Sequence, residues 1–279
     1  MDADFKGRTV IVTGGSEGVG AATARRFAAT GANIVLVART RKNLDLVAGE
    51  LGDKTGVLTI AMDVCDHDAA INLFKKAEYE FGAINVLVNN AGYHSRGPVE
   101  KVDAADLGKM VDVNLKAPVI LSRLAIPYLR QAGAGAIINV GSLAGRTPVP
   151  GAATYSASKA GLRAFTYALA EELTDTDIKL AIVSPGPIDT GFIMSNIDIV
   201  TDITFSQPMS TADEVAAVIM DLATGTKRER SMPPLSGFLT TLNYLSPGIG
   251  SVIRPLLEKK GRRVKRKLKA KMRAQEQES

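Results

Sequence analysis

A glycine-rich turn between a strand and a helix, close to the start of the chain, constrains the fold more than any other feature. Residues 8–13 have the β-branched, apolar character of a buried parallel strand, and residues 21–27 are predicted to be helical. Glycines between them let the backbone approach a pyrophosphate, whose charge the free N–H groups and the dipole of the helix stabilise. A second apolar run at 33–38 follows at the distance expected for a βαβ unit, so the turn predicts a dinucleotide site.

The rest of the chain continues this alternation of strands and helices. Strands are predicted at 8–13, 33–38, 56–62, 84–89, 135–141 and 178–184. Helices are predicted at 18–30, 41–51, 67–81, 103–130 and 152–175, and a capping box of Thr211 and Glu214 opens another through 223. Only residues 228–233 can supply a seventh strand, and Pro233 would end it early. The expected fold is α/β: a single Rossmann-type, doubly wound parallel sheet with helices on both faces.

Length and composition agree with one large domain. With 279 residues, 46% of them hydrophobic, the chain can bury a substantial core, and we assign residues 1–235 to that domain and 236–279 to a basic, helical C-terminal extension. The single cysteine, Cys65, excludes an internal disulfide, and two histidines without partnering cysteines predict no metal site. The short polar start and the lack of an apolar run of about eighteen residues predict a cytoplasmic protein with neither signal peptide nor membrane-spanning helix.

Tyr155 and Lys159 lie four residues apart on the predicted helix at 152–175, so their side chains share one face. A unit charge about 4 Å away at an effective dielectric of about 20 contributes roughly 4 kcal/mol, enough to lower the pKa of Tyr155 by at most about three. A tyrosine tuned in this way can protonate a carbonyl oxygen while hydride arrives at the carbon. The same spacing is common on solvated helix faces, so the pair needs the other motifs to carry this meaning.

The remaining motifs resemble, in their order, those of the short-chain dehydrogenase/reductase family. The matching elements are Thr13-Gly14-x-x-x-Gly18-x-Gly20, Asp63-Val64, Asn89-Asn90-Ala91-Gly92, Asn114, Ser142, Tyr155-x-x-x-Lys159 and Pro185-Gly186-Pro187-Ile188-x-Thr190. They extend from residue 8 to about 192. The resemblance implies an NAD(P)-dependent oxidoreductase. A non-enzymatic dinucleotide sensor or scaffold is the alternative. Such members of the family commonly lose a catalytic residue, whereas this sequence keeps all four catalytic residues of the family, which are named below.

The resemblance implies the catalytic residues Asn114, Ser142, Tyr155 and Lys159. Tyr155 would act as a reversible general acid and base, and Lys159 would lower its pKa and hold the nicotinamide ribose. Ser142 would donate a hydrogen bond to the substrate carbonyl, while Asn114 would order a water that relays protons to the lysine. The cofactor is expected to contact Thr13, Gly14, Ser16, Glu17, Gly18, Val19, Gly20, Arg39, Asp63, Val64, Asn90, Ala91, Gly92, Tyr155, Lys159, Pro185, Gly186, Ile188 and Thr190.

The residue after the second strand decides between the two nicotinamide cofactors. A carboxylate there would bind the ribose 2′-OH of NAD(H), whereas an arginine accommodates the 2′-phosphate of NADP(H). This chain has Arg39, followed by Arg41 and Lys42, so NADP(H) is favoured over NAD(H). Glu17 departs from the pattern of many NADP-preferring relatives, since a carboxylate in the glycine loop weakens phosphate binding. The alternative for Arg39 is an ordinary surface arginine.

The lid expected at 190–208 is rich in apolar side chains and predicts an apolar pocket for a small-molecule or lipid-like carbonyl substrate. His94, just after the Asn-Ala-Gly turn, is expected to line that pocket without taking part in catalysis. Asp66 is interpreted as an N-cap and not as a metal ligand beside His67. Because relatives often associate through the helices near 103–130 and 152–175, a homodimer or homotetramer is expected.

The C-terminal extension is the most individual part of the chain. Residues 254–273 contain eleven Lys or Arg and one acid, Glu258, a net charge of +10 that leaves −5 for the remainder. The apolar residues before them are too interrupted by Pro and Gly to span a bilayer. This end is similar in placement to that of the membrane-associated 3-ketosphinganine reductases, so residues 236–273 are expected to lie at an anionic membrane surface.

Two alternatives for this extension stay open. One is a solubilising helix that covers an oligomer edge, in a soluble enzyme that acts on a small ketone. The other is nucleic-acid binding, which the sequence disfavours because aromatic interleaving and a recognised module are both missing and a basic run supplies only salt-sensitive, nonspecific affinity.

Overall fold

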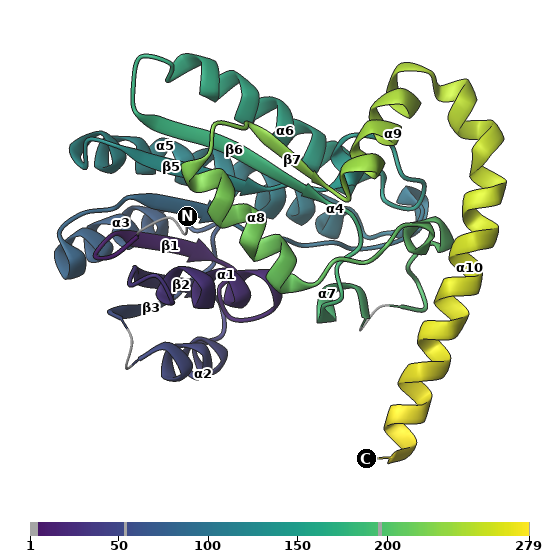
Figure 1. The fold of residues 1–279 in the computed structure, drawn as a ribbon, viewed down its shortest axis with the longest axis horizontal. Coiled ribbons are helices and arrows are strands. Elements are labelled where there is room, and N and C mark those ends of the chain that lie inside the picture. The colour runs from purple at the N-terminus through teal and green to yellow at the C-terminus, as the bar shows by residue number, and fades with distance from the viewer. Residues whose placement is uncertain (1–4, 53–54, 195–196, 279) are drawn as a thin grey trace.

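The computed structural model describes residues 5–52, 55–194 and 197–278, which form a parallel sheet of seven strands. The strands are β1 (Thr9–Thr13), β2 (Asn33–Ala38), β3 (Val57–Ala61), β4 (Val86–Asn89), β5 (Gly135–Val140), β6 (Ile178–Pro185) and β7 (Glu229–Met232). Their order across the sheet is β3-β2-β1-β4-β5-β6-β7 (Figure 1). This order confirms the doubly wound fold. Sheets of this kind bind ligands where the order reverses, which here is between β1 and β4.

Helices cover both faces of the sheet (Figure 1). On one face, α1 (Gly18–Ala28), α2 (Arg41–Leu51) and α8 (Ala212–Thr224) share a core with inward-facing strand residues. On the other, α3 (His67–Phe81), α5 (Ala117–Gln131) and α6 (Ala153–Glu172) enclose a second core. The central strands are buried on both sides, which is why they appear in the sequence as nearly continuous Val, Ile and Leu runs.

The helix predicted at 103–130 is interrupted. α4 (Ala104–Val111) leads into a π-helical segment, η2 (Asp112–Lys116), before α5 begins. A π-helical turn accommodates one extra residue and often occurs at functional sites. Asn114 lies inside this segment, so the irregular turn sets the direction of a predicted catalytic side chain.

The seventh strand forms despite the two prolines. β7 pairs with β6 over four residues, from Glu229 to Met232, and Pro233 follows directly after the last paired residue. Pro233 is then the N-cap of α9 (Pro234–Leu245), where the missing N–H of a proline costs nothing. The capping box of Thr211 and Glu214 opens α8 as predicted.

The C-terminal extension folds back over the lid. α10 (Pro247–Glu278), the long yellow helix in Figure 1, packs against η4 (Asp202–Ser206). Gly261 allows the close approach, because a Cβ added there would lie 1.8 Å from the carbonyl oxygen of Asp202. Apolar side chains of α10, of the lid and of Met209 just after it form a separate core: Ile193, Ile197, Val200, Phe205, Met209, Val264, Leu268 and Met272.

Basic side chains of α10 are neutralised at this contact. Lys265 donates to the carbonyl oxygen of Val200 at 2.6 Å and lies 3.8 Å from a carboxylate oxygen of Asp202, while Arg262 pairs with the same carboxylate at 3.2 Å. Lys269 pairs with Asp198. The helix is therefore part of the lid structure of its own chain, an arrangement that neither alternative for the extension included.

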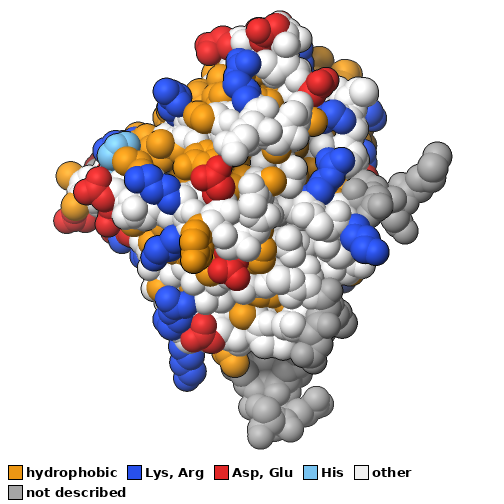
Figure 2. Space-filling model, turned by 90° about the vertical axis from the view of Figure 1, so that its left-hand side faces the viewer, with side chains coloured by type: hydrophobic (Ala, Val, Ile, Leu, Met, Phe, Trp, Pro, Cys, Tyr) orange, Lys and Arg blue, Asp and Glu red, His pale blue; other side chains and the backbone are white. Residues whose placement is uncertain are grey.

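The end of the molecule opposite α10 has a mixed surface. Acidic, basic and apolar side chains are interspersed there (Figure 2). Among the helices of the described ranges, none combines the length and the hydropathy that crossing a bilayer requires.

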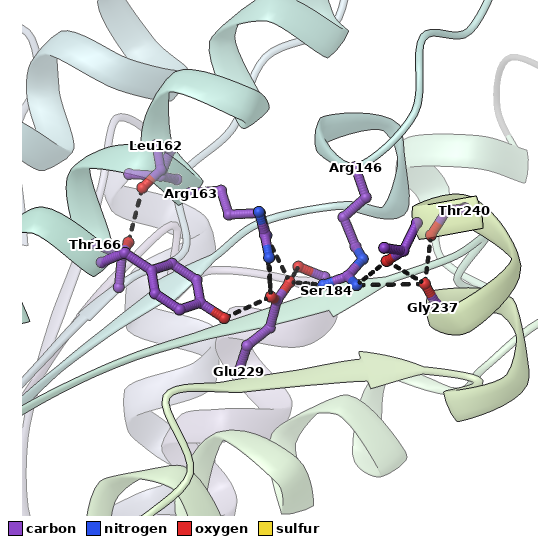
Figure 3. Close-up of polar contacts among 10 residues, drawn as sticks. Arg146, Leu162, Arg163, Thr166, Ser184, Glu229, Gly237 and Thr240 are labelled. Carbon is purple, nitrogen blue, oxygen red and sulfur yellow. Dashed lines mark hydrogen bonds and ion pairs between the residues drawn. The ribbon is translucent and has the colours of Figure 1, made fainter. Parts of the chain in front are cut away.

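A buried carboxylate on β7 connects α6, β6 and the loop after β5 (Figure 3). Arg163 of α6 bonds both oxygens of Glu229, with Nη2 2.8 Å from Oε2, and the hydroxyl of Tyr167 donates to the same oxygen at 2.9 Å. Ser184 donates to Oε1 at 2.8 Å, and Nη1 of Arg146 lies 2.5 Å from it. Since α6 also carries Tyr155 and Lys159, these contacts hold the helix of the predicted site.

Arg146 carries the connection onward to α9. Its guanidinium donates to the carbonyl oxygen of Gly237 at 3.3 Å and to the hydroxyl of Thr241 at 2.7 Å. Burial alone would raise the pKa of Glu229, but the hydrogen bonds from Arg163, Arg146 and Ser184 outweigh it and hold the pKa at about 2. The ionised carboxylate is thus the form that the fold stabilises.

This pKa predicts how stability depends on pH in Glu229→Gln. A pKa lowered from 4.5 to about 2 contributes stability above pH 4.5, roughly 3 kcal/mol, that is lost as the pH falls toward 2. Urea unfolding should therefore show the variant less stable than wild type at pH 7, with the difference shrinking below pH 4.5. Glu171→Gln, which removes an exposed ion pair with Arg228, is the control and should change little. A pH-independent difference would contradict this account.

Candidate functional site

A cleft of about 1640 Å³ lies at the carboxyl ends of the strands. The predicted site residues that line it are Gly14, Glu17, Gly18, Val19, Asn90, Ala91, Gly92, Ser142, Tyr155, Lys159, Pro185, Gly186, Ile188 and Thr190. The predicted residues that do not line it are Thr13, Ser16, Gly20, Arg39, Asp63, Val64 and Asn114. The structure thus brings most of the predicted set to one cavity.

The glycine turn forms one end of this cleft. Gly14 and Gly18 have φ angles of +63° and +52°, which side chains other than glycine rarely adopt. A Cβ on Gly20 would lie 2.0 Å from the carbonyl oxygen of Gly14, so the turn and the first turn of α1 are in direct contact. Glu17, the N-cap of α1, makes no side-chain capping bond. The N–H groups of that helix end are therefore not capped by the Glu17 side chain. Because Gly18 and Val19 line the cleft, this helix end fits a pyrophosphate.

Hydrogen bonds join the loops after β1 and β4. The hydroxyl of Thr13 accepts from the backbone N–H of Asn90 at 2.9 Å and of Ala91 at 3.0 Å. The Asn90 side chain donates in return to the carbonyl oxygens of Thr13 at 2.9 Å and Gly14 at 3.2 Å. Thr13 thus acts from beneath the cleft, by holding its walls at a fixed separation.

The segment after β6 closes the cleft from the other side. Methyl Cγ2 of Thr190 lies 3.5 Å from the place where a Cβ of Gly18 would be. The backbone of Gly186 donates to Met232 at 2.7 Å, and an isolated bridge joins Ile188 to Ser210. These bonds hold the segment 185–190, which is predicted to contact the cofactor, opposite the glycine turn.

Two basic residues after β2 differ in their surroundings. Arg41 donates to the hydroxyl of Thr59 at 2.7 Å and lies near Asp45, whereas Arg39 is exposed and has no ion pair within the ranges that the structure describes. The guanidinium of Arg39 is therefore not engaged by an acidic side chain of the described residues. Asp63 is also exposed, and its Oδ1 accepts from the N–H of Cys65 at 2.9 Å.

Tyr155 and Lys159 project from α6 into the cleft. The ammonium of Lys159 donates to the carbonyl oxygen of Val140, at the end of β5, at a distance of 2.8 Å. It lies 5.9 Å from the centre of the Tyr155 ring. Only 4% of Lys159 is exposed, so its charge is withdrawn from bulk water.

Burial dominates the electrostatics of this pair. It raises the pKa of Tyr155, although a hydrogen bond with Ser142 and the positive charge of Arg96 act in the opposite direction. Burial also lowers the pKa of Lys159 to about 8. The prediction that Lys159 lowers the pKa of Tyr155 is therefore wrong for this structure. The ammonium is directed at a backbone carbonyl, and the cation that acts on the phenol is Arg96.

Ser142 and Asn114 support the pair from two sides. Ser142 follows β5 and accepts from the N–H of Ala144 at 3.1 Å, as the N-cap of η3 (Leu143–Gly145). Asn114 is fully buried; it exchanges bonds with the backbone of Tyr93, both at 2.8 Å, and donates to Ser158 at 3.2 Å. Asn114 thus ties the loop after β4 to α6, one residue away from Lys159.

The sequence did not predict the arrangement around His94. Its ring stacks on Tyr155 with centroids 4.1 Å apart and planes 9° apart, and Phe192 from the lid lies 6.3 Å away. Burial, with the charges of Arg96 and Lys159, lowers the pKa of His94 to about 3, so the imidazole is neutral. Its Nε2 is buried without a hydrogen-bond partner among the described residues. No spacing in the sequence signals such a stack.

The same cleft also has an apolar lining. It comes from the lid, with Phe192, Ile193 and Ile199, and from α9, with Leu235 and Leu239. The lid contribution agrees with the apolar lid read from the sequence. The contribution of α9 means that the extension forms part of the pocket wall.

The glycine turn supplies a direct prediction about cofactor binding. In Gly14→Ala, residue 14 would have to keep a backbone φ of +63°, which alanine rarely adopts. Its new Cβ would lie 2.8 Å from Nδ2 of Asn90, which disrupts the hydrogen bonds between the two loops. The dissociation constant for NADPH, measured by fluorescence titration, should rise roughly tenfold or more. Gly82→Ala is the control, with a similar φ of +76° and no atom within 4 Å. Equal NADPH affinity in both variants would contradict the assignment.

Similar proteins identify the family. Residues 8–198 match the family model described as short chain dehydrogenase. Sulfoacetaldehyde reductase 2 of Chromohalobacter salexigens is 38% identical over 187 residues, 66% of this chain and 74% of that protein. The ketoacyl reductase HetN of Nostoc sp. is 33% identical over 221 residues, 78% of this chain and 77% of that protein. A metagenomic short-chain oxidoreductase solved in complex with NADP has a TM-score of 0.70 at 32% identity, covering 82% of this chain and 98% of its own. The chain therefore belongs to the short-chain dehydrogenase family of oxidoreductases.

Proposed function

We propose that this protein is an NADPH-dependent reductase that converts the carbonyl of an apolar, lipid-like substrate into an alcohol. The observation that carries the proposal is that Tyr155 and Ser142 line one cleft together with the glycine turn and with apolar side chains of the lid and α9. Sulfoacetaldehyde reductase and ketoacyl reductase, two relatives named above, are also named for the reduction of carbonyl compounds.

NADPH, when bound, supplies the hydride, and the side chains of this chain supply the proton and the orientation. Tyr155 is protonated at neutral pH and donates its proton to the carbonyl oxygen. The hydrogen bond with Ser142 and the charge of Arg96 both lower its pKa and so offset part of the rise that burial causes. Ser142 donates a second hydrogen bond to that oxygen. Lys159, held by Val140, lies where it can bind the nicotinamide ribose, and Asn114 fixes the helix that carries both residues.

Tyr155→Phe tests this chemistry. Loss of the hydroxyl removes the general acid, so the rate of NADPH oxidation with 3-oxo-acyl substrates should fall roughly 10²- to 10⁴-fold. The dissociation constant for NADPH should stay the same, because the ring and its stack with His94 remain. A variant that keeps more than a few per cent of the activity would contradict the role of Tyr155. Absence of activity in the wild type across a broad ketone panel would favour a dinucleotide sensor.

The preference for NADP(H) rests on Arg39. Its guanidinium is exposed and without an ion pair in the described ranges, while Arg41 is already bonded to Thr59. In Arg39→Gln the KM for NADPH should rise roughly tenfold or more, with the KM for NADH unchanged. Arg41→Gln is the control and should leave the ratio of the two constants as in the wild type. An unchanged ratio in Arg39→Gln would refute the assignment.

We further propose that α9 and α10 dock on an anionic membrane. α9 exposes a run of large apolar side chains: Leu235, Phe238, Leu239, Leu242, Tyr244 and Leu245. The helix that follows exposes Lys259, Lys260, Arg263, Arg266 and Lys267, in addition to the residues paired with the lid. Apolar anchors beside basic side chains suit a membrane interface, and α9 also lines the cleft, so a lipid-like substrate would have a short path into it.

Point substitutions test this docking better than truncation, because removal of α10 would uncover the core that it shares with the lid. In the double variant Phe238→Asp and Leu245→Asp, binding to liposomes that contain phosphatidylserine should weaken roughly tenfold to a hundredfold. The control pair is Leu46→Asp and Tyr79→Asp, two exposed apolar residues on α2 and α3. Equal binding by all three proteins would contradict the proposal, as would tighter binding to duplex DNA at physiological salt.

A further inference from the structure

Arg96 is a cation that lines the cleft beside the lid residue Phe192. Its Nη2 donates to the carbonyl oxygen of Phe192 at 3.3 Å, and its Cζ lies 5.6 Å from the centre of the Phe192 ring. Across the ranges that the structure describes, no carboxylate forms an ion pair with it. Arg25 and Arg254, which line the same cleft, are paired with Glu50 and Glu258 at 2.7 Å.

The position of Arg96 relative to the phenol follows from a chain of ring contacts. His94 stacks on Tyr155, Phe192 lies next to His94, and Arg96 lies over Phe192. The guanidinium and the phenol thus line the same cleft and are linked through two intervening rings, so one substrate molecule can contact both. Partial burial lowers the pKa of Arg96, so an anion beside the guanidinium would stabilise its charged form.

We propose that Arg96 binds an acid group, a carboxylate or sulfonate, at the end of the substrate remote from the carbonyl. This inference rests on the reaction proposed above and narrows its substrate class to carbonyl compounds that also carry an anionic group. A planar guanidinium offers two parallel N–H groups to such an anion. The neutral imidazole of His94, whose buried Nε2 has no hydrogen-bond partner among the described residues, stacks on the phenol ring.

Matched acid and amide substrates test the proposal. The series 4-oxo-, 5-oxo- and 6-oxooctanoate is compared with the corresponding primary amides, which have the same shape and no charge. For the best pair, the wild type should favour the acid in kcat/KM, and this preference should fall roughly 10- to 100-fold in Arg96→Met. Arg96→Lys should recover part of it. If Arg96 only holds the lid through Phe192, the variant would lose activity on acid and amide equally, and the proposal would be overturned.

A binding measurement separates this proposal from the proposed reaction. Titration calorimetry of the NADP+-saturated protein compares octanoate with octanamide, neither of which can be reduced at a ketone. Octanoate should bind at least roughly tenfold more tightly to the wild type, and Arg96→Met should bind both alike. Equal affinities in the wild type, no octanoate binding, or a preference that survives in the variant would each overturn the proposal. Selective octanoate binding without turnover of any ketone would support the anion site and refute the reductase.

Discussion

The hydrogen bonds between Thr13 and Asn90 hold together the two loops on which the rest of the site depends. They lie between β1 and β4, where the strand order reverses and neighbouring loops diverge to opposite faces of the sheet. Without a fixed separation at this point, the glycine turn and the Asn-Ala-Gly turn would not face the same ligand. The hydroxyl of Thr13 and the side-chain amide of Asn90, two uncharged groups, thus hold the two loops that line the cleft at a fixed separation.

The lid and the C-terminal helix form one mechanical unit with the pocket. α10 holds η4 through Gly261 and its ion pairs, and the same lid carries Phe192, whose backbone and ring both contact Arg96. A change in the position of α10 would therefore also move Phe192 and Arg96, which line the cleft. The membrane docking proposed for α9 and α10 would in this way couple the location of the protein to the position of its lid.

Features set by local sequence could be predicted, and those set by distant contacts could not. The glycine turn, the buried strands and the capping box of α8 depend on residues close in the chain, and the prediction matched them. The π-helical turn at Asn114 was not predicted, because a single shift in the phase of the apolar positions does not stand out within one long helix. β7 was uncertain because Pro233 and Pro234 were expected to end it early. The strand forms, and Glu229 on it is held by partners such as Arg163, 66 positions away.

The site shows the same division. Motif spacing brought Ser142, Tyr155 and Lys159 to one cleft, but it could not give the direction of the lysine ammonium or the degree of burial, and the predicted pKa change of the tyrosine was wrong in sign. The stack of His94 on Tyr155 and the contact between Arg96 and Phe192, 96 positions apart, follow from the path of the lid across the sheet.

A crystal structure of the complex with NADP+ would test the central claim most directly. The account predicts the pyrophosphate at the N–H groups of the first turn of α1, above the bonded pair Thr13 and Asn90, with the nicotinamide ribose beside Lys159 and the Tyr155 hydroxyl facing the nicotinamide. A dinucleotide bound elsewhere, or a Tyr155 side chain turned away from the nicotinamide into solvent, would contradict it.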